Sequence, residues 1–488
     1  GRGYMKKEMK GIKKIELPQM IAVAFMIVFL VLVEWFVVSS LAKNHFIRRN
    51  EAIMKKAEEA DAKQYNEAVE VQTQTIGNTV FTVSYPTVNQ QIVEPIQNEL
   101  DTLLEKVKEQ YKNESKRTWV YLKVYQSHVL TDIKDVYYYQ SVYQETKKGL
   151  EQLVYDELIH QLEGKEKSGT AVIGELFVND LEVTNHFVKK AMKVAKEQSL
   201  SEEQTEQLLK EFAYENWKNL DASIIQNGFR FNLKEPIQTN NGETLRQISF
   251  AFQELFAILK SDRIPESQQE AYQNWKNQLE ERLNEKRVAI SFDDGPSSEL
   301  TPKVLDILKR YGVHATFYIM GKHVPGNEEI IKQIIDEGHE VGNHSYSHPL
   351  LTTLTPEGVH KQVADTQKLI GDATGGIRPT TLRPPYGGFD RMVAEQAGIA
   401  ILNWSVDTLD WKSHNVNSIL QEVREGTYNG SIILMHDIHA ETVEALPRLL
   451  DFLQQEGYAI GSIEELMGGQ AMLPNHVYFD RKSHKEVQ

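Results

Sequence analysis

The sequence predicts an α/β protein whose C-terminal part is a distorted (β/α)7-type barrel, preceded by a transmembrane helix and a smaller α+β middle domain. Three observations predict this architecture. An unbroken apolar run starts at Met20, strand and helix patterns are mixed between residues 75 and 260, and short apolar strands alternate regularly with helices from Arg287 onwards. A chain of 488 residues has room for two or three domains, so all three parts fit.

Composition excludes several functional classes. The net charge is −15, so the chain has no positive excess to neutralise phosphates, and we expect no nucleic acid partner. The chain contains no cysteine, which excludes disulfides, thiolate metal sites and a cysteine nucleophile.

The N-terminal part predicts a membrane anchor. Residues 1–16 are short and basic, and the apolar run within residues 17–42 is long enough to cross a bilayer. Glu34 lies near the far end of this run, where its carboxylate can reach the interface. A cleaved signal peptide is the alternative, because Ser40-Leu41-Ala42 is a small-x-small sequence. The apolar run is long for a signal, so we favour an uncleaved anchor with a cytoplasmic N-terminus and the rest of the chain outside the cell.

A stalk, a middle domain and a linker are expected next. Residues 43–74 are rich in Glu, Lys and Ala and predict a solvated juxtamembrane helix. In the middle domain, 75–260, strand patterns occupy residues 80–85, 119–125 and 136–143, and helical patterns occupy 93–111, 150–162 and 185–198. The tyrosines at 137–139 predict a buried sheet face rather than a sugar-binding surface. Residues 261–285 read as a helical linker.

The barrel is expected over residues 286–467. Its predicted strands are residues 287–292, 315–319, 340–343, 381–383, 399–405, 431–435 and 458–461. Seven strand–helix units are too few for a complete eight-unit barrel, and an open doubly wound sheet is the alternative. The tail, 468–488, has no pattern that predicts structure.

Polar side chains follow these strands at their carboxyl ends, where barrels and open α/β sheets build active sites. They are Asp293, Asp294, His344, His348, Arg383, Tyr386, Asp410, Trp411 and His436. Asp293 and Asp294 are adjacent, and two neighbouring carboxylates raise each other's pKa. Their negative charge therefore requires a positive group nearby, and a metal ion is the simplest candidate.

His344 and His348 are four residues apart, which is one helical turn, so we expect both imidazoles to face one ion. With Asp294 they supply two nitrogens and one oxygen and leave a position for water, which is typical of a catalytic metal site. Zinc suits these ligands best, and cobalt or nickel would also bind.

The remaining polar groups predict hydrolysis. Asp293 can act as general base on the attacking water, and Arg383 can hold it ionised and oriented. His436 is the candidate general acid, with Asp410 orienting it and raising its pKa.

An acyl group is the expected substrate moiety. The turn at Tyr386 can offer a backbone N–H to a developing oxyanion. Trp411, Tyr386 and Leu434 would form an apolar slot for a small acyl group. Together with the acid and the base, these features predict hydrolysis of an acyl bond.

Five motifs occur in a fixed order: Ser-Phe-Asp-Asp-Gly-Pro, His-Ser-Tyr-Ser-His-Pro, Arg-Pro-Pro-Tyr-Gly, Asp-Thr-Leu-Asp-Trp and Leu-Met-His. Over residues 287–467 the chain thereby resembles the polysaccharide deacetylase family, also called the NodB-homology domain or carbohydrate esterase family 4. The resemblance implies a distorted barrel and metal-dependent removal of acetyl groups from N-acetylated sugars, with the residue roles just given. Ser291 stands where the family usually has threonine, a change that we expect to have no effect on the chemistry.

The order of anchor, stalk, middle domain and barrel resembles that of peptidoglycan N-acetylglucosamine deacetylases of Gram-positive cocci. This resemblance implies a peptidoglycan substrate at the outer face of the cell membrane and lysozyme resistance as the consequence. The motifs are shared with enzymes acting on chitin, exopolysaccharide and acetylated xylan, including O-acetyl esterases, so these substrates are alternatives. An inactive wall-binding module is a further alternative, but it predicts a missing base or ligand, and every expected group is present.

Overall fold

The computed structural model describes residues 17–64, 66, 68–147 and 149–488. The predicted cytoplasmic segment, residues 1–16, lies outside them. The chain divides into two compact units. One contains the residues up to 126 together with 136–160, and the other contains 127–135 together with 161–488.

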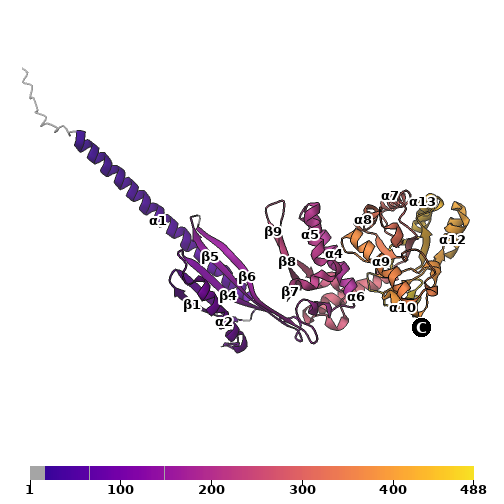
Figure 1. The fold of residues 1–488 in the computed structure, drawn as a ribbon, viewed down its shortest axis with the longest axis horizontal. Coiled ribbons are helices and arrows are strands. Elements are labelled where there is room, and N and C mark those ends of the chain that lie inside the picture. The colour runs from indigo at the N-terminus through magenta and orange to yellow at the C-terminus, as the bar shows by residue number, and fades with distance from the viewer. Residues whose placement is uncertain (1–16, 65, 67, 148) are drawn as a thin grey trace, which may run out of the picture. The chain divides into compact units, whose positions relative to one another are not determined.

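A single helix, α1 (Leu17–Gln64), begins the first unit (Figure 1). The large apolar side chains of its first half are exposed, for example Phe25 at 73% and Trp35 at 68%. The helix is long and apolar enough to cross a membrane, judged by length and composition. Membrane anchors and signal sequences near an N-terminus both have helices of this kind.

The second half of α1 does not form the solvated stalk that we expected at 43–74. Ile47 and Met54 are seven residues apart, lie on one side of the helix and are buried against the sheet of the first unit. On the same helix, Glu58 Oε2 lies 2.5 Å from Lys123 Nζ, and both side chains are almost completely buried. This segment is rich in charged residues, and its composition therefore predicted a solvent-exposed helix. Its few apolar residues, such as Ile47 and Met54, become buried only when the helix packs on the sheet of the folded unit.

The sheet of the first unit has the strand order β1-β2-β4-β5-β6, with β3 beside β2. The strands are β1 (Ala68–Ile76), β2 (Thr79–Val88), β3 (Gln91–Ile92), β4 (Thr118–Gln126), β5 (Lys134–Thr146) and β6 (Gly149–Glu163). Helix α2 (Glu94–Tyr111) packs on one face through Leu100, Leu103 and Val107. The three predicted strands and the helix at 93–111 are therefore confirmed, and β4 and β5 pair as an antiparallel hairpin.

The helix predicted at 150–162 is wrong, because these residues belong to the edge strand β6. Their apolar residues recur at nearly helical spacing, which is why the pattern favoured a helix. Pairing with the long strand β5 instead satisfies backbone groups that an open sheet edge would leave unpaired. The tyrosines are buried in the sheet as predicted, but on both of its faces: Tyr138 packs in the α2 cluster, and Tyr137 and Tyr139 are buried in another cluster.

Before the barrel, the second unit has a helical and a small β part. Its elements are α3 (Ala171–Gly174), α4 (Asp180–Glu197), α5 (Glu202–Phe212), β7 (Asp221–Ile225), β8 (Gly228–Gln238), β9 (Thr244–Ala251) and α6 (Gln269–Asn284). Side-chain caps begin α4 at Asn179 and α5 at Ser201. The buried ring of Phe187 on α4 packs against Phe250 of β9, with 4.1 Å between centroids. The helices predicted at 185–198 and in the linker are confirmed by α4 and α6.

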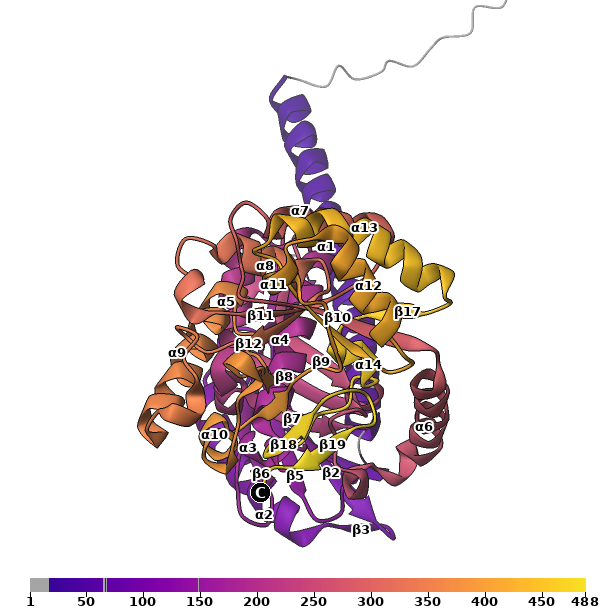
Figure 2. The same ribbon diagram turned by 90° about the vertical axis from the view of Figure 1, so that its right-hand side faces the viewer.

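The barrel strands run parallel, except for the final β18–β19 pair. They are β10 (Arg287–Asp293), β11 (Thr316–Ile319), β12 (Glu340–Asn343), β13 (Thr381–Leu382), β14 (Ala400–Leu402), β15 (Val406–Asp407), β16 (Ile432–His436), β17 (Ala459–Gly461), β18 (His476–Tyr478) and β19 (His484–Glu486). The helices are α7 (Thr301–Tyr311), α8 (Glu328–Asp336), α9 (Pro356–Thr374), α10 (Arg391–Ala397), α11 (Asp410–Ser413), α12 (Val416–Gly426), α13 (Ala440–Gln455) and α14 (Ile463–Leu466). Figure 2 shows helices around strands β10, β11 and β12.

The strand order shows why the sheet curls. β15 and β14 lie at the two ends of the series β15-β16-β10-β11-β12-β13-β14, yet only residues 403–405 separate them in the chain. The sheet therefore curls until β14 and β15 approach each other, as in a distorted barrel, which confirms the predicted fold class. No pattern in the tail predicted its structure, but the tail adds β18 beside β14. Strands of three residues are too short to show a periodic pattern in the sequence.

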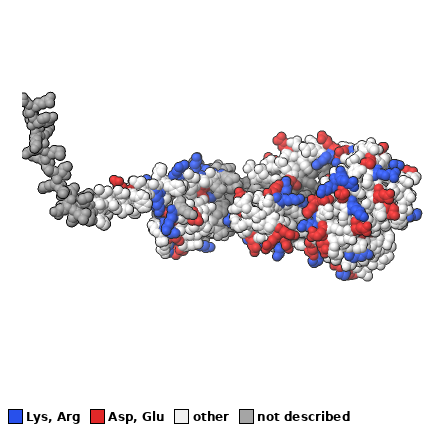
Figure 3. Space-filling model, turned by 90° about the horizontal axis from the view of Figure 1, so that it is seen from above, with Lys and Arg blue, Asp and Glu red and all other residues white. Residues whose placement is uncertain are grey.

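The surface of the second unit carries mixed charge. On the face that Figure 3 shows, Lys and Arg are interspersed with Asp and Glu over this unit. Neither sign dominates that face, which agrees with a modest negative net charge spread over 488 residues.

Candidate active site

The predicted site residues lie at the carboxyl ends of neighbouring parallel strands. Asp293 is the last residue of β10 and lies opposite Tyr318 of β11 and His436 of β16 in the ladder. His344 directly follows β12, and Arg383 directly follows β13. The strand register therefore places acidic, basic and imidazole side chains on one rim of the barrel.

Asp294, His344 and His348 converge. One ligand atom from each lies within 4.8 Å of the others. Asp294 Oδ1 is 3.2 Å from His344 Nε2 and 3.3 Å from His348 Nε2. This carboxylate oxygen is buried and accepts no hydrogen bond within the described part of the chain. A buried oxygen without a hydrogen bond, facing two imidazole nitrogens, fits a site for a divalent cation.

The protonation of these groups also fits a cation. His344 Nδ1 lies 2.7 Å from the carbonyl oxygen of Arg383, and since a carbonyl only accepts, this nitrogen carries the proton. Nε2 is the nitrogen that faces Asp294, and once it loses its proton its lone pair can bind a metal. Burial alone would raise the pKa of Asp294, but the imidazoles of His344, His436 and His348 hold it below its ordinary value. The carboxylate is therefore ionised, as a ligand must be.

The two histidines do not lie on one helical turn, and that part of the prediction is wrong. Residues 344–350 form an irregular loop after β12, in which Ser345 and His348 have positive φ angles of 64° and 65°. The hydroxyl of Ser345 accepts a hydrogen bond from the backbone N–H of His348 at 3.1 Å. Gln362 Oε1 on α9 accepts from the backbone N–H of Tyr346 at 2.8 Å. Hydrogen bonds from neighbouring side chains, which spacing cannot reveal, thus bring both imidazoles together.

Arg383 holds Asp293 in one orientation. Its Nη1 donates to Asp293 Oδ1 at 2.8 Å and to Ser291 Oγ at 2.7 Å, while Nε and Nη2 donate to the carbonyl oxygens of residues 402 and 403. The guanidinium is completely buried and its charge is paired. Ser291 was expected to be unconnected with the chemistry, yet its hydroxyl helps to fix Arg383. A threonine would supply the same hydroxyl, so this departure from the family pattern keeps the contact.

His436 and Asp410 form a buried pair. His436 Nδ1 lies 2.7 Å from Asp410 Oδ1, and Asp410 Oδ2 accepts from the backbone N–H of His436 and from the hydroxyl of Thr442. Burial alone would lower the pKa of His436, but the hydrogen bond to Asp410 and the nearby carboxylates raise it to about 9. A protonated imidazole at this position can donate a proton. Thr442 was missed from the sequence, because a threonine in the first turn of a helix is common without such a role.

Tyr386, Trp411 and Leu434 were expected to form an apolar slot, which stays a prediction. The side chain of Tyr386 is 71% exposed, and its ring lies 4.8 Å from that of His348 between centroids. Trp411 is 50% exposed, whereas Leu434 is buried within β16. Tyr386 has a positive φ of 61°, and Asp294 has one of 74°. Such backbone conformations are costly for non-glycine residues and occur preferentially at functional sites.

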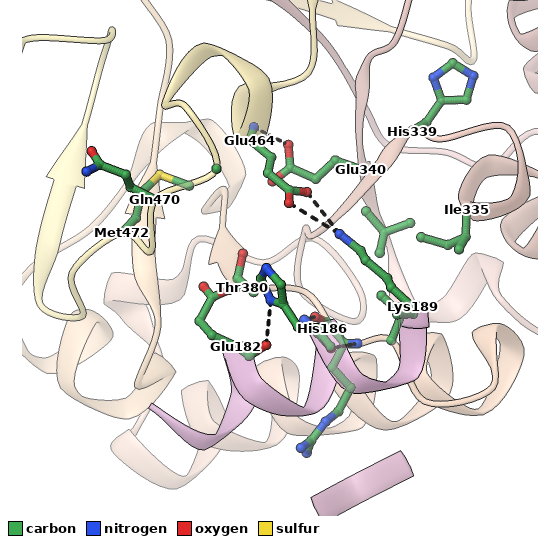
Figure 4. Close-up of a pocket in the computed structure, with 15 residues that line it drawn as sticks. Glu182, His186, Lys189, Ile335, His339, Glu340, Thr380, Glu464, Gln470 and Met472 are labelled. Carbon is green, nitrogen blue, oxygen red and sulfur yellow. Dashed lines mark hydrogen bonds and ion pairs between the residues drawn. The ribbon is translucent and has the colours of Figure 1, made fainter. Parts of the chain in front are cut away.

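A second concentration of charged groups surrounds Glu340, the first residue of β12, at the end of this strand opposite to His344 (Figure 4). The pocket is lined by residues of α4, β12 and α14, among others, and by none of the predicted site residues. Lys189 Nζ lies 3.2 Å from Glu464 Oε2, and the backbone N–H of Glu464 donates to Glu340 Oε2 at 2.9 Å. Burial, together with the negative charge of Glu464, raises the pKa of Glu340 to about 7.

Replacing Glu340 with glutamine is expected to stabilise the protein more at pH 8 than at pH 5. Glu340 takes up a proton on folding, because its folded pKa of about 7 exceeds the ordinary value of 4.5. Wild-type stability should therefore fall by about 3 kcal/mol as the pH rises from about 4.5 to 7, and the variant should lose this dependence. The unfolding free energies of the wild type and of Glu340→Gln, measured in urea at pH 5 and pH 8, test this prediction. Glu444→Gln, at an exposed position, is the control. An equal difference at both pH values would contradict the prediction.

Comparison with known proteins gives the family. A polysaccharide deacetylase model matches residues 280–402, and a model described as the peptidoglycan GlcNAc deacetylase N-terminal domain matches residues 51–273. The chain is 45% identical over 203 residues to peptidoglycan-N-acetylglucosamine deacetylase PgdA of Listeria monocytogenes, covering 42% of this chain and 43% of that protein. It is 40% identical over 183 residues to peptidoglycan-N-acetylmuramic acid deacetylase PdaC of Bacillus subtilis, covering 38% of this chain and 39% of that protein.

These two matches span less than half the length of each relative. A peptidoglycan-N-acetylglucosamine deacetylase of Bacillus cereus is 36% identical over 192 residues, which are 38% of this chain and 89% of that protein. The similarity to this third relative thus covers nearly its whole length. In addition, the ordered motifs lie on one rim of the barrel, and the family model matches the first barrel strands. The chain therefore belongs to the polysaccharide deacetylase family.

Proposed function

We propose that this protein is a metal-dependent hydrolase that removes N-acetyl groups from N-acetylglucosamine residues of peptidoglycan. The observation that carries the proposal is the convergence of Asp294, His344 and His348, with Asp293 and His436 beside them on the same rim. Among polysaccharides, peptidoglycan is supported by the region before the barrel, whose matching family model is described as belonging to peptidoglycan deacetylases.

The three converging residues would hold the divalent cation, which we propose to be zinc because its preferred ligands are two imidazole nitrogens and a carboxylate oxygen. Cobalt or nickel would fit the same ligands. When bound, the cation supplies a Lewis acid that polarises the acetyl carbonyl and lowers the pKa of water.

Asp293 is proposed to be the general base. Its Oδ1 is fixed by Arg383, so Oδ2 is the oxygen available to accept a proton, and it lies 3.7 Å from His344 Nε2. The nucleophile must therefore approach from the side of the metal ligands. The backbone N–H of Tyr386 is proposed to donate to the carbonyl oxygen as negative charge develops on it.

His436 is proposed to be the general acid. Nδ1 donates its proton to Asp410, so Nε2 is the nitrogen that can protonate the sugar nitrogen as the C–N bond breaks. Nε2 lies 3.9 Å from Asp294 Oδ2, which places the acid beside the proposed metal ligand. The products are acetate and a sugar with a free amine.

We propose that α1 anchors the protein in the cell membrane, with residues 1–16 in the cytoplasm and the barrel on the wall side. The exposed apolar first half of α1 supports an anchor, since such side chains are unfavourable in water. The proposed domain limits follow the sequence for the anchor, 17–42, the middle domain, 75–260, the linker, 261–285, and the deacetylase domain, 286–467. The limits 43–74 and 468–488 need adjustment, because α1 ends at Gln64, β1 of the first unit begins at Ala68, and β18 of the tail joins the barrel sheet. Free amines on the glycan would lower its affinity for lysozyme and so give resistance.

Acetate release from purified peptidoglycan tests the function. We expect release by the full-length protein, its loss after treatment with a chelator and its recovery on adding Zn²⁺. Chitin oligomers, exopolysaccharide and acetylated xylan are the comparison substrates. Faster release from any of these would overturn the substrate assignment, and unchanged release after complete removal of metal would overturn the chemistry.

The His436→Ala variant is expected to release acetate about 10²-fold more slowly, because the leaving nitrogen loses its proton donor. Since His436 is not among the converging ligands, the variant should bind metal as the wild type does. His439→Ala is the matched control, because this imidazole lies 5.7 Å from that of His436 between centroids and has no assigned role. Equal rates for both variants would contradict the role of His436.

A further inference from the structure

The turn that carries Asp294 is held by residues outside the predicted site. Asp294 has a φ of +74°, so its backbone is in the left-handed region. An aspartate adopts this conformation only when its surroundings stabilise it. The direction of the Asp294 side chain towards His344 and His348 depends on this conformation.

His323, after β11, contacts the turn from one side. His323 Nδ1 lies 2.7 Å from the carbonyl oxygen of Asp294, and because a carbonyl only accepts, Nδ1 donates. The backbone N–H of Met320 donates to the carbonyl of Gly295 at 3.1 Å. The carbonyl of His323 itself accepts from Asn327 Nδ2 at 2.9 Å, which fixes the donor loop.

Asp437, after β16, contacts the turn from the other side. Its carboxylate is only 1% exposed and packs so closely on Gly295 that a Cβ there would lie 2.4 Å from Oδ2. Oδ2 accepts from the hydroxyl of Thr301 at 2.5 Å, and the same hydroxyl accepts from the backbone N–H of Ser297 at 2.8 Å. Asp437 thus contacts the turn directly at Gly295 and, through the hydroxyl of Thr301, at Ser297.

We infer that His323 and Asp437 are positioning residues that set the affinity of the Asp294–His344–His348 site for its metal ion. The inference rests on the proposed metal site. Neither residue belongs to the converging ligand set, and each acts through the backbone of residues 294–297. The two imidazoles are held by the loop after β12 and by Arg383, so Asp294 is the ligand whose position depends on these contacts. Residues that orient metal ligands typically change metal affinity about 10- to 100-fold.

Metal affinity of the full-length protein tests the inference without measuring catalysis. Zn²⁺ binding is followed by competition with a chromophoric chelator, and Co²⁺ binding by visible absorption, which reports the ligand geometry. We expect His323→Ala and Asp437→Ala to bind Zn²⁺ about 10- to 100-fold more weakly than the wild type and to shift the Co²⁺ bands. His323→Asn, whose side-chain N–H₂ can donate to the same carbonyl, is expected to recover most of the affinity.

His339→Ala is the matched control for loss of stability. His339 is a buried histidine whose Nδ1 accepts from the backbone N–H of Ala315 at 3.1 Å, at the amino end of β12. The His339→Ala variant should have a lower melting temperature than the wild type but the same affinity for Zn²⁺. Wild-type affinity in His323→Ala and Asp437→Ala would overturn the inference, and so would an equal loss in His323→Ala and His323→Asn. Failure of the wild type to bind metal would instead overturn the proposed function.

Discussion

Replacing His344 with alanine is expected to reduce acetate release at least about 10³-fold and to remove most of the bound metal. His344 supplies one of two imidazole nitrogens beside Asp294 Oδ1, and its ring is buried at 2% exposure. Two remaining ligands cannot hold a divalent cation tightly against water. Loss of the Lewis acid then costs several kcal/mol of transition-state stabilisation, which corresponds to this factor.

The metal content per chain and the rate of acetate release are the two measurements. His339→Ala is again the control, since His339 and His344 lie at opposite ends of the same strand, β12, and both are buried. The control should keep both metal and activity. If His344→Ala retained a full equivalent of metal, the ligand set proposed here would be wrong. If it lost the metal but kept its activity, the cation would have no part in the reaction.

Strand positions and strand-end residues were predictable because the barrel is built from short local patterns. Each predicted strand from Arg287 to Gly461 corresponds to observed strands, and the residues after them face one rim because parallel strands have a common direction. The first unit was less predictable. Its strand β6 has nearly helical apolar spacing, and only pairing with β5 decides between the two structures.

The details of the site could not be predicted from spacing. The separation of His344 and His348 fits a helix, but a loop brings them together, held by the side chains of Ser345 and Gln362. Hydroxyl and amide side chains of this kind are common throughout the sequence, so nothing marks these two in advance. The same applies to His323 and Asp437, whose contacts with the Asp294 turn arise from neighbouring strands far apart in the chain.

Replacing Asp293 with asparagine is expected to reduce kcat about 10³-fold, with little change in KM or metal content. Asparagine has the shape of aspartate, so its amide oxygen can still accept the hydrogen bond from Arg383 Nη1, but the amide cannot take a proton from water. Asp293 is not among the converging ligand residues. A loss of activity with the metal retained therefore separates the base from the ligands.

The same substitution should also destabilise the fold, because Arg383 is completely buried and Asp293 is its one ion-pair partner among the described residues. Removing one partner of a buried pair typically costs about 3–5 kcal/mol, although Arg383 keeps its three other acceptors. Kinetics must therefore be measured well below the melting temperature of the variant. A variant that is less stable but fully active would show that Asp293 only balances the charge of Arg383, and the proton would then have to be accepted by another group on the rim.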